Sequence, residues 1–150
     1  TKARIYNMYG PTETTIWSTI KELTNADSVT IGEPIANTRV YITDTKGHLL
    51  PRGVFGELCI SGDGVSKGYV NGKEETESRF REGEQFKERR VYCTGDRGRL
   101  LDSGEIEISG RMDHQVKLHG CRIELEEIEG TAQNSGLVEN ASAIIRKIVD

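Results

Sequence analysis

Residues 39–61 read RVYITDTKGHLLPRGVFGELCIS, and this stretch decides the fold. Apolar and polar side chains alternate over 39–44 and again over 56–61, which is the period of a half-buried β-strand. Turn signals separate these runs at Lys46-Gly47 and at Pro51-Arg52-Gly53. The alternation resumes over 91–94, 98–101 and 105–109. The sequence therefore predicts a small distorted β-barrel or folded sheet over about 37–109.

The segments beside this β-rich region have a different character. Residues 73–90 carry dense mixed charge and predict a solvated helix and loop. After Asp113 the pattern predicts a hairpin over 115–124, a helix from Leu125 that stops near Gly136, and a strand over 141–149. The predicted fold class is therefore α+β and β-rich, with one unit over 1–112 and a small α/β unit over 113–150.

The composition limits the partners. Hydrophobic residues make up 35% and charged residues 29% of the 150 residues, the mean hydropathy is -0.53, and the net charge is only -4. Residues of opposite charge are interleaved, so the chain has no basic stripe that would neutralise a nucleic-acid backbone. No apolar run approaches the roughly 20 residues of a membrane-spanning helix. We therefore expect a cytoplasmic protein that binds neither nucleic acid nor membranes.

The cysteines predict no metal or redox centre. Cys59, Cys93 and Cys121 lie far apart in the sequence, each inside a strand-like run. They lack the Cys-x-x-Cys spacing of a zinc site or a redox pair. We therefore expect three free thiols.

A series of short motifs carries the chemistry. In chain order these are Asn7–Glu13 (NMYGPTE), Gly56–Tyr69, Thr94-Gly95-Asp96 and Gly110–Asp113. Tyr9 offers a ring face for a base, Thr12 a hydroxyl for a phosphate oxygen, and Glu13 a hard oxygen ligand of the kind that Mg²⁺ prefers. Asp96 adds an acceptor-only carboxylate and Arg111 a fork of directional donors. Together these groups are what binding a nucleotide and a metal requires.

Each motif alone also fits a structural role. Residues 10–13 can be a loop that enters a helix, with Thr12 as its cap and Glu13 near the positive end of the helix dipole. For residues 62–69 we expect this structural role, because their glycines permit a bent hairpin. Arg111 can be an ordinary surface arginine.

Taken in order, and continued through residues 115–129, the series resembles the adenylate-forming ligases. It is most similar to the amino-acid adenylation domains of nonribosomal peptide synthetases, over about 5–129. The family's phosphate loop and its late lysine match nothing in these residues. We therefore expect the C-terminal part of a large adenylation subdomain over 1–112, followed by a hinge and the first part of the small C-terminal subdomain over 113–150.

The resemblance implies ATP and Mg²⁺ as cofactors. The positions that match the family's nucleotide contacts are Asn7, Tyr9, Gly10, Thr12, Asp96, Ile108 and Arg111. Among them Asp96 is implied to accept the ribose hydroxyls and Arg111 to reach the ribose and phosphates, whereas Ile108 stands where the family often has an aromatic residue. The implied catalytic residues are Thr12, Glu13 and Lys117, with Glu13 as the metal ligand.

Other matching positions concern the substrate and domain motion. Met8, Ile16 and Trp17 correspond to the amino-acid pocket, and their bulk favours glycine first and alanine second. Asp113 corresponds to the hinge about which the small domain swings. Lys117 corresponds to a lysine that this swing brings to the active site.

The expected function follows from the resemblance. The parent protein would form an aminoacyl-AMP and load the aminoacyl group onto the phosphopantetheine thiol of a carrier domain, beside condensation domains in a peptide or hybrid polyketide megasynthase for antibiotic biosynthesis. The 150 residues alone are expected to be inactive. Two alternatives remain open: a segment of an acyl- or aryl-CoA ligase, and a non-catalytic β-rich module that docks a partner.

Overall fold

The computed structural model describes residues 3–88, 90–113, 116–118 and 121–146. It forms two compact units, Thr1–Met112 and Asp113–Asp150. Neither helix in these ranges has the length and apolar character that a membrane span requires. The elements are β1 (Tyr6–Tyr9), the 3-10 turn η1 (Thr12–Thr14), β2 (Thr19–Glu22), β3 (Glu33–Pro34), β4 (Thr38–Thr43), β5 (Gly56–Gly62), α1 (Lys73–Arg79), β6 (Phe80–Glu82), β7 (Arg90–Leu100), β8 (Ile106–Arg111), β9 (Val116–Leu118), β10 (Cys121–Ile123) and α2 (Leu125–Asn134).

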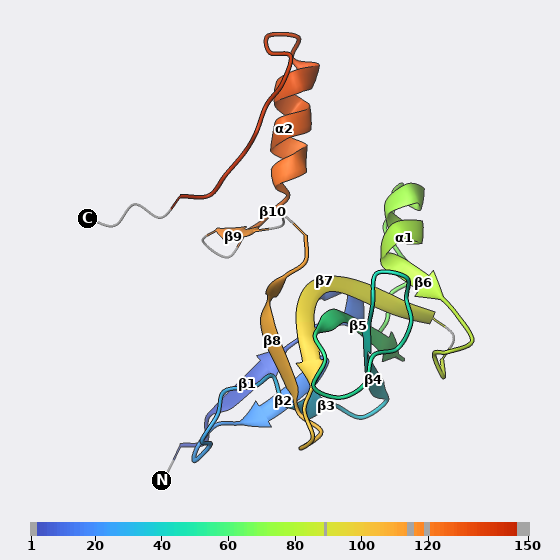
Figure 1. Ribbon diagram of the computed structural model, residues 1–150, viewed down its shortest axis with the longest axis vertical. Coiled ribbons are helices and arrows are strands. Elements are labelled where there is room, and N and C mark those ends of the chain that lie inside the picture. The colour runs from blue at the N-terminus through green and yellow to red at the C-terminus, as the bar shows by residue number, and fades with distance from the viewer. Residues whose placement is uncertain (1–2, 89, 114–115, 119–120, 147–150) are drawn as a thin grey trace. The chain divides into compact units, whose positions relative to one another are not determined.

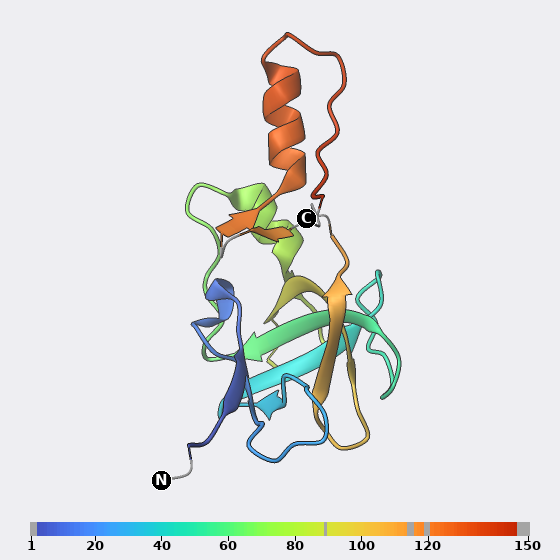
Figure 2. The same cartoon turned by 90° about the vertical axis from the view of Figure 1, so that its left-hand side faces the viewer.

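The first unit is built on a curled antiparallel sheet (Figures 1 and 2). Its strand order is β4-β5-β7-β6, and β8 pairs with β7. The strands β4 and β5 stay in register from Thr38 opposite Gly62 to Thr43 opposite Glu57. The predicted β-rich fold with a barrel-like sheet is thus confirmed.

Strand β7 differs from the prediction. The sequence predicted separate runs over 91–94 and 98–101, and Gly95-Asp96 between them is a pair common in turns, but the structure has one strand of 11 residues. The register shifts between Arg97 and Gly98 of β7 in its pairing with β8, and between Glu57 and Cys59 of β5 in its pairing with β7. Such bulges bend a strand without ending it, which is why the turn signal was misleading.

A three-stranded sheet, β1-β2-β3, adjoins β8. The N–H of Ile31 donates to the carbonyl of Ile106 at 2.9 Å, and the N–H of Ile106 donates to the carbonyl of Gly32 at 2.8 Å. Gly32 has a φ of +77°, and a Cβ there would lie 1.9 Å from the Ile20 carbonyl oxygen. Only glycine fits at this contact between the three-stranded sheet and β8. The contact brings β1 and its motif residues next to the curled sheet.

Both faces of β5 are buried, as the alternation of side chains along a strand requires. Leu58 packs on one face in a cluster with Ile42 and Ile106. Its neighbour Cys59 packs on the other face in a cluster with Phe86. The apolar run over 58–60 is therefore explained by a strand at the centre of the sheet.

The charged segment 73–90 begins with the predicted helix. No residue of α1 is buried. The structure then adds strand β6, which the sequence did not predict, and buries Phe80 and Phe86 at 5% and 2% exposure. These two aromatic residues anchor an otherwise solvated segment to the sheet.

The second unit contains the predicted hairpin and helix. Strands β9 and β10 are antiparallel, and Arg122 lies opposite Lys117 in their register. Helix α2 is followed by Gly136 at a φ of +71°, a left-handed position that suits glycine after a helix. The apolar side of α2 and the segment 141–145 line a groove of about 550 Å³.

The predicted strand over 141–149 is wrong for residues 141–146, which adopt no regular structure. A strand needs a neighbour for its backbone groups, and within the described residues this segment has a side-chain partner instead: the N–H of Ala143 donates to Glu129 Oε1 at 2.8 Å. Residues 147–149 lie outside the described part of the chain.

Candidate functional site

Three predicted residues meet at the end of the curled sheet. Asp96 in β7 lies opposite Arg111 in β8, and Arg111 Nη1 donates to Asp96 Oδ1 at 3.0 Å. The hydroxyl of Tyr9, from β1, donates to the other carboxylate oxygen of Asp96. Residues that are 87 positions apart in the sequence therefore share one carboxylate.

The backbone around Asp96 is held in place by hydrogen bonds. The Asp96 N–H donates to Thr94 Oγ1 at 2.9 Å, and the Thr94 hydroxyl donates to a main-chain carbonyl of β5 at 2.8 Å. The N–H of Gly95 donates to Glu57 Oε1 at 3.2 Å. Gly95 has a φ of +75°, which glycine adopts without strain. The carboxylate of Asp96 is thus presented from a fixed position.

The surroundings of Tyr9 keep its hydroxyl protonated. Burial raises the pKa of Tyr9 well above its usual range, and the charge of Asp96 and the hydrogen bond to it raise it further, against the weaker opposite effect of Arg111. Tyr9 therefore remains a donor at neutral pH. An ionised carboxylate offers about four acceptor positions, so Asp96 can accept further hydroxyl donors beside these two side chains.

The turn that carries Thr12 and Glu13 packs closely on itself. A Cβ on Gly10 would lie 2.5 Å from the Ile16 carbonyl oxygen, so glycine is required there. The structural alternative for this motif is wrong in its main detail. Pro11, not Thr12, occupies the cap position, no side chain caps the turn, and only the three residues of η1 are helical.

Glu13 is buried, with 6% of its surface exposed. Tyr69 donates its hydroxyl to Glu13 Oε1 at 2.7 Å, and the N–H of Ser66 donates to the Glu13 carbonyl at 2.8 Å. The sequence assigned 62–69 to structure alone and therefore missed Tyr69. The only available signal was the position of its motif in the series.

The remaining predicted nucleotide contacts are placed as follows. Asn7 Nδ2 donates to the carbonyl of Thr30 at 2.7 Å. Ile108 packs against the buried cluster of Ile42 and Leu58. Both residues lie in the first unit, where they stabilise the elements that carry Tyr9 and Asp96.

The three predicted pocket residues lie near the first motif. Met8 lies in β1 opposite Ile20, and its side chain is partly exposed. Ile16 and Trp17 are 69% and 52% exposed. Ile16 has a φ of +68°, which is unusual for a β-branched residue.

Two predicted residues belong to the second unit. Asp113 is its first residue, directly after the last residue of the first unit, Met112. Lys117 lies in β9, but its side chain is outside the part of the structure that is described.

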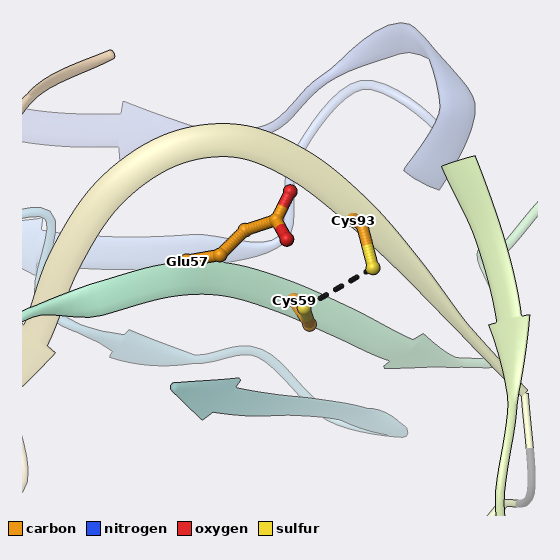
Figure 3. A group of neighbouring side chains, drawn as sticks. All are labelled: Glu57, Cys59 and Cys93. Atoms are coloured by element: carbon orange, nitrogen blue, oxygen red, sulfur yellow. Dashed lines mark hydrogen bonds between the residues drawn. The ribbon is translucent and has the colours of Figure 1, made fainter. Parts of the chain in front are cut away.

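A group of side chains beside the site could suggest a metal centre: Glu57, Cys59 and Cys93 (Figure 3). Cys59 donates its thiol to Cys93 Sγ at 3.4 Å. This hydrogen bond, followed by burial, raises the pKa of Cys59, and the same bond lowers the pKa of Cys93. Both are free thiols as predicted, whereas the side chain of Cys121 lies outside the described part.

The carboxylate in this group already has protein partners. Glu57 accepts from Gly95 and lies 3.6 Å from Arg81 Nη1. A cation would have to compete with this guanidinium in a site where Glu57 is only 8% exposed. We therefore assign the group to the packing of β5 against β7.

The chain is similar to known proteins of one family. Residues 1–70 match the family described as AMP-binding enzyme. Surfactin synthase subunit 1 from Bacillus subtilis (strain 168) is 45% identical over 144 residues, which is 93% of this chain and 4% of that protein. The chain thus spans a small part of the length of this relative.

Solved structures of nonribosomal peptide synthetases (NRPS) share the fold. One is PA1221, an NRPS protein containing adenylation and PCP domains, with a TM-score of 0.80 and 30% identity over 97% of this chain and 30% of that chain. Another is holo-AB3403, a four-domain synthetase bound to AMP and glycine, with a TM-score of 0.70 and 40% identity over 98% of this chain and 11% of that chain.

Proposed function

Because this chain belongs to the AMP-binding enzymes, as part of an adenylation domain, we propose that the protein containing it joins an amino acid to the AMP part of ATP and releases pyrophosphate. The observation that carries this proposal is the meeting of Tyr9, Asp96 and Arg111. Asp96 accepts the two ribose hydroxyls, and its two protein donors hold it in the required orientation. Arg111 also places a positive charge beside the phosphates.

The ring and the hydroxyl of Tyr9 have different roles in this proposal. It packs against the apolar cluster that contains Ile42, and its hydroxyl holds Asp96. In this proposal the ring also stacks on the adenine, as aromatic side chains do with bases. Base and ribose are thereby held by residues in direct contact.

The chain also fits a magnesium ion. Glu13 brings a carboxylate and Thr12 a hydroxyl from one tight turn, and such hard oxygen ligands suit Mg²⁺ bound to substrate phosphates. When bound, the ion would neutralise phosphate charge during transfer. The protein's contribution is to hold these oxygen atoms on a turn that Gly10 allows to pack closely.

The test is amino-acid-dependent exchange of radiolabelled pyrophosphate into ATP by the full-length protein. We expect exchange with amino acids, and loss of exchange in Asp96→Ala. Exchange with fatty or aryl acids only would favour the CoA ligase alternative. Unchanged activity in Asp96→Ala would favour the non-catalytic module.

For the substrate we infer glycine, with alanine second. Met8, Ile16 and Trp17 match the family's amino-acid pocket in sequence, and their bulk would leave a small side chain the most room. The relative AB3403 is bound to glycine, which supports this inference. Faster exchange with a large or charged amino acid than with glycine would contradict it.

We further propose that the aminoacyl group passes to the phosphopantetheine thiol of a carrier domain in the same megasynthase, beside condensation domains. Its support is the PCP domain of the relative PA1221 and the boundary between compact units at Asp113. In this proposal Asp113 is the hinge and Lys117 acts after the swing. Asp113→Pro should retain pyrophosphate exchange but lose carrier loading, measured by mass spectrometry. Equal loss of both activities would contradict the hinge.

A further inference from the structure

The contact between Tyr69 and Glu13 is specific and buried. The Tyr69 hydroxyl donates to Glu13 Oε1 at 2.7 Å across 56 positions of sequence. Glu13 is 6% exposed, so water can contribute little to fixing its carboxylate. A glutamate side chain has three rotatable bonds, and a hydrogen bond to one oxygen selects among its rotamers.

Tyr69 is itself held rigidly. Its N–H donates to Thr76 Oγ1 at 2.9 Å, and the Thr76 hydroxyl donates to the carbonyl of Gly72 at 2.7 Å. Its ring meets that of Phe80 edge-on, with 5.7 Å between centroids. The residue before it, Gly68, has a φ of +130° and no room for a Cβ beside Thr76. These contacts fix the position of the Tyr69 side chain, whose hydroxyl points toward Glu13.

A second phenol lies at the same place. Tyr92 is 1% exposed, and its ring centroid lies 5.1 Å from that of Phe80. Its hydroxyl is a hydrogen-bond neighbour of Tyr69 and lies beside the charge of Glu13. Tyr92 therefore belongs to the same group of side chains around this carboxylate.

The main chain of the same loop holds the turn on which Glu13 lies. The N–H of Ser66 donates to the Glu13 carbonyl at 2.8 Å, and Thr15 Oγ1 donates to the carbonyl of Gly64 at 2.8 Å. Backbone and side chain of Glu13 are thus both positioned by residues 64–69.

We propose that Tyr69 is a positioning residue that orients the Glu13 carboxylate toward the nucleotide-bound cation, with Tyr92 in support. This inference rests on the proposed function. Partners of this kind orient metal ligands, and their removal weakens metal binding while the ligand itself remains. The loop that contains Tyr69 therefore orients a metal ligand, in addition to the structural role that its glycines indicate.

The test compares Tyr69→Phe, Tyr41→Phe and Glu13→Gln in the full-length protein. The readout is binding of Mn²⁺ in the presence of a non-hydrolysable ATP analogue, followed by electron paramagnetic resonance. Tyr69→Phe keeps the ring on Phe80 and removes only the hydroxyl, so we expect about tenfold weaker Mn²⁺ binding. Excess Mg²⁺ should restore the exchange rate of this variant, and its KM for the amino acid should stay unchanged.

Tyr41→Phe is the matched control. It also deletes a phenol that donates to a glutamate, Glu88 Oε2 at 3.0 Å, but at a site away from the motif residues. We expect its Mn²⁺ affinity to equal that of the wild type. If Tyr69→Phe does not fold, Tyr92→Phe takes its place, with a smaller expected loss.

The outcomes separate this inference from the proposed function. Wild-type Mn²⁺ affinity in Tyr69→Phe, together with weakened binding in Glu13→Gln, would overturn the positioning role and leave the proposed function intact. Wild-type affinity in both variants would overturn the positioning role together with the assignment of Glu13 as the metal ligand, whereas the exchange assay decides the proposed function. Equal losses in Tyr69→Phe and Tyr41→Phe would also overturn the positioning role, because the effect would not be specific to Glu13.

Discussion

Asp96 accepts hydrogen bonds from a neutral phenol and a cationic guanidinium, and the two donors differ in what they contribute. Arg111 lies directly opposite Asp96 in the sheet, so the β-ladder itself brings this pair together. Tyr9 arrives from a separate sheet, so its contact depends on the tertiary fold. The side chains of Asp96 and Arg111 are 15% and 28% exposed, which leaves them accessible to a ligand.

Removing the Tyr9 hydroxyl tests whether it orients the Asp96 carboxylate. Tyr9→Phe keeps the ring but deletes one donor to Asp96. We expect the KM for ATP to rise about tenfold, which corresponds to the weaker end, about 1.5 kcal/mol, of the range for one hydrogen bond to a charged group. The measurement is pyrophosphate exchange at varied ATP. An unchanged KM would mean that Arg111 alone orients Asp96.

The pH dependence of this effect follows from the raised pKa of Tyr9. A raised pKa keeps the phenol protonated beyond the usual value of about 10. The ratio of KM values for Tyr9→Phe and wild type should therefore stay constant between about pH 7 and about pH 10. A ratio that falls toward 1 over this range would show that Tyr9 loses its proton.

The residues of the site were only partly predictable from the sequence. Motif order indicated Tyr9, Asp96 and Arg111, and the structure brings these three together. Motif order did not indicate that Tyr69 would contact Glu13, because no local sequence pattern links positions that are 56 residues apart. Such contacts depend on how the sheet curls, which is a property of the whole unit.

At the scale of elements, strands with a partner were predictable and their bends were not. Alternation identified β4, β5 and β8 because each buries one or both faces in the sheet. The same signal failed over 141–146, where no ladder forms. It also divided β7 in two, because a bulge and a turn use the same small residues.

The close approach of Gly32 to the backbone of β2 predicts an intolerant glycine. Gly32→Ala should lower the free energy of unfolding by more than about 2 kcal/mol, since its Cβ would overlap the Ile20 carbonyl in addition to the backbone strain. Gly53→Ala is the matched control, with a similar φ of +80° but nothing within 4 Å of the added Cβ. It should cost about 1 kcal/mol. Equal losses in denaturant unfolding would refute the steric argument.

The ion pair between Lys21 and Glu105 predicts how stability depends on pH. The hydrogen bond from Lys21, followed by that from Thr30, lowers the pKa of Glu105. A lowered carboxyl pKa stabilises the fold above the unfolded value of about 4.3, and this contribution is lost as the pH falls through the folded value. Lys21→Met should therefore destabilise the protein at neutral pH, and the difference from wild type should shrink below about pH 4.

A second ion pair gives the control for this prediction. Lys73 and Glu77 are 88% and 67% exposed, against 20% and 18% for Lys21 and Glu105. Exposed pairs contribute little, so Lys73→Met should leave the unfolding midpoint unchanged at each pH. A constant difference between Lys21→Met and wild type from acid to neutral pH would show that charge is not the cause.

At the scale of the whole molecule, the described contacts of the candidate nucleotide site lie within Thr1–Met112. The residue proposed for the later transfer step, Lys117, belongs to the other unit. This division suits a protein that uses one unit for binding and moves the other between steps.

The isolated 150 residues should show no pyrophosphate exchange above the blank, even at high ATP and amino acid. Positioning of both reactants contributes roughly 7 to 11 kcal/mol to catalysis, and this contribution requires the complete set of contacts. The chain spans 30% of the matched PA1221 structure. Exchange by the isolated chain would show that its own residues suffice.

The central claim is that Asp96 binds the ribose of one nucleotide together with Tyr9 and Arg111. The most direct measurement is the Kd for AMP of full-length Asp96→Asn by calorimetry, with Asp102→Asn, an exposed aspartate in a turn, as the control. We predict at least about tenfold weaker binding in Asp96→Asn, because a charge-assisted acceptor is lost, and no change in Asp102→Asn. Equal AMP affinity in both variants would contradict the claim.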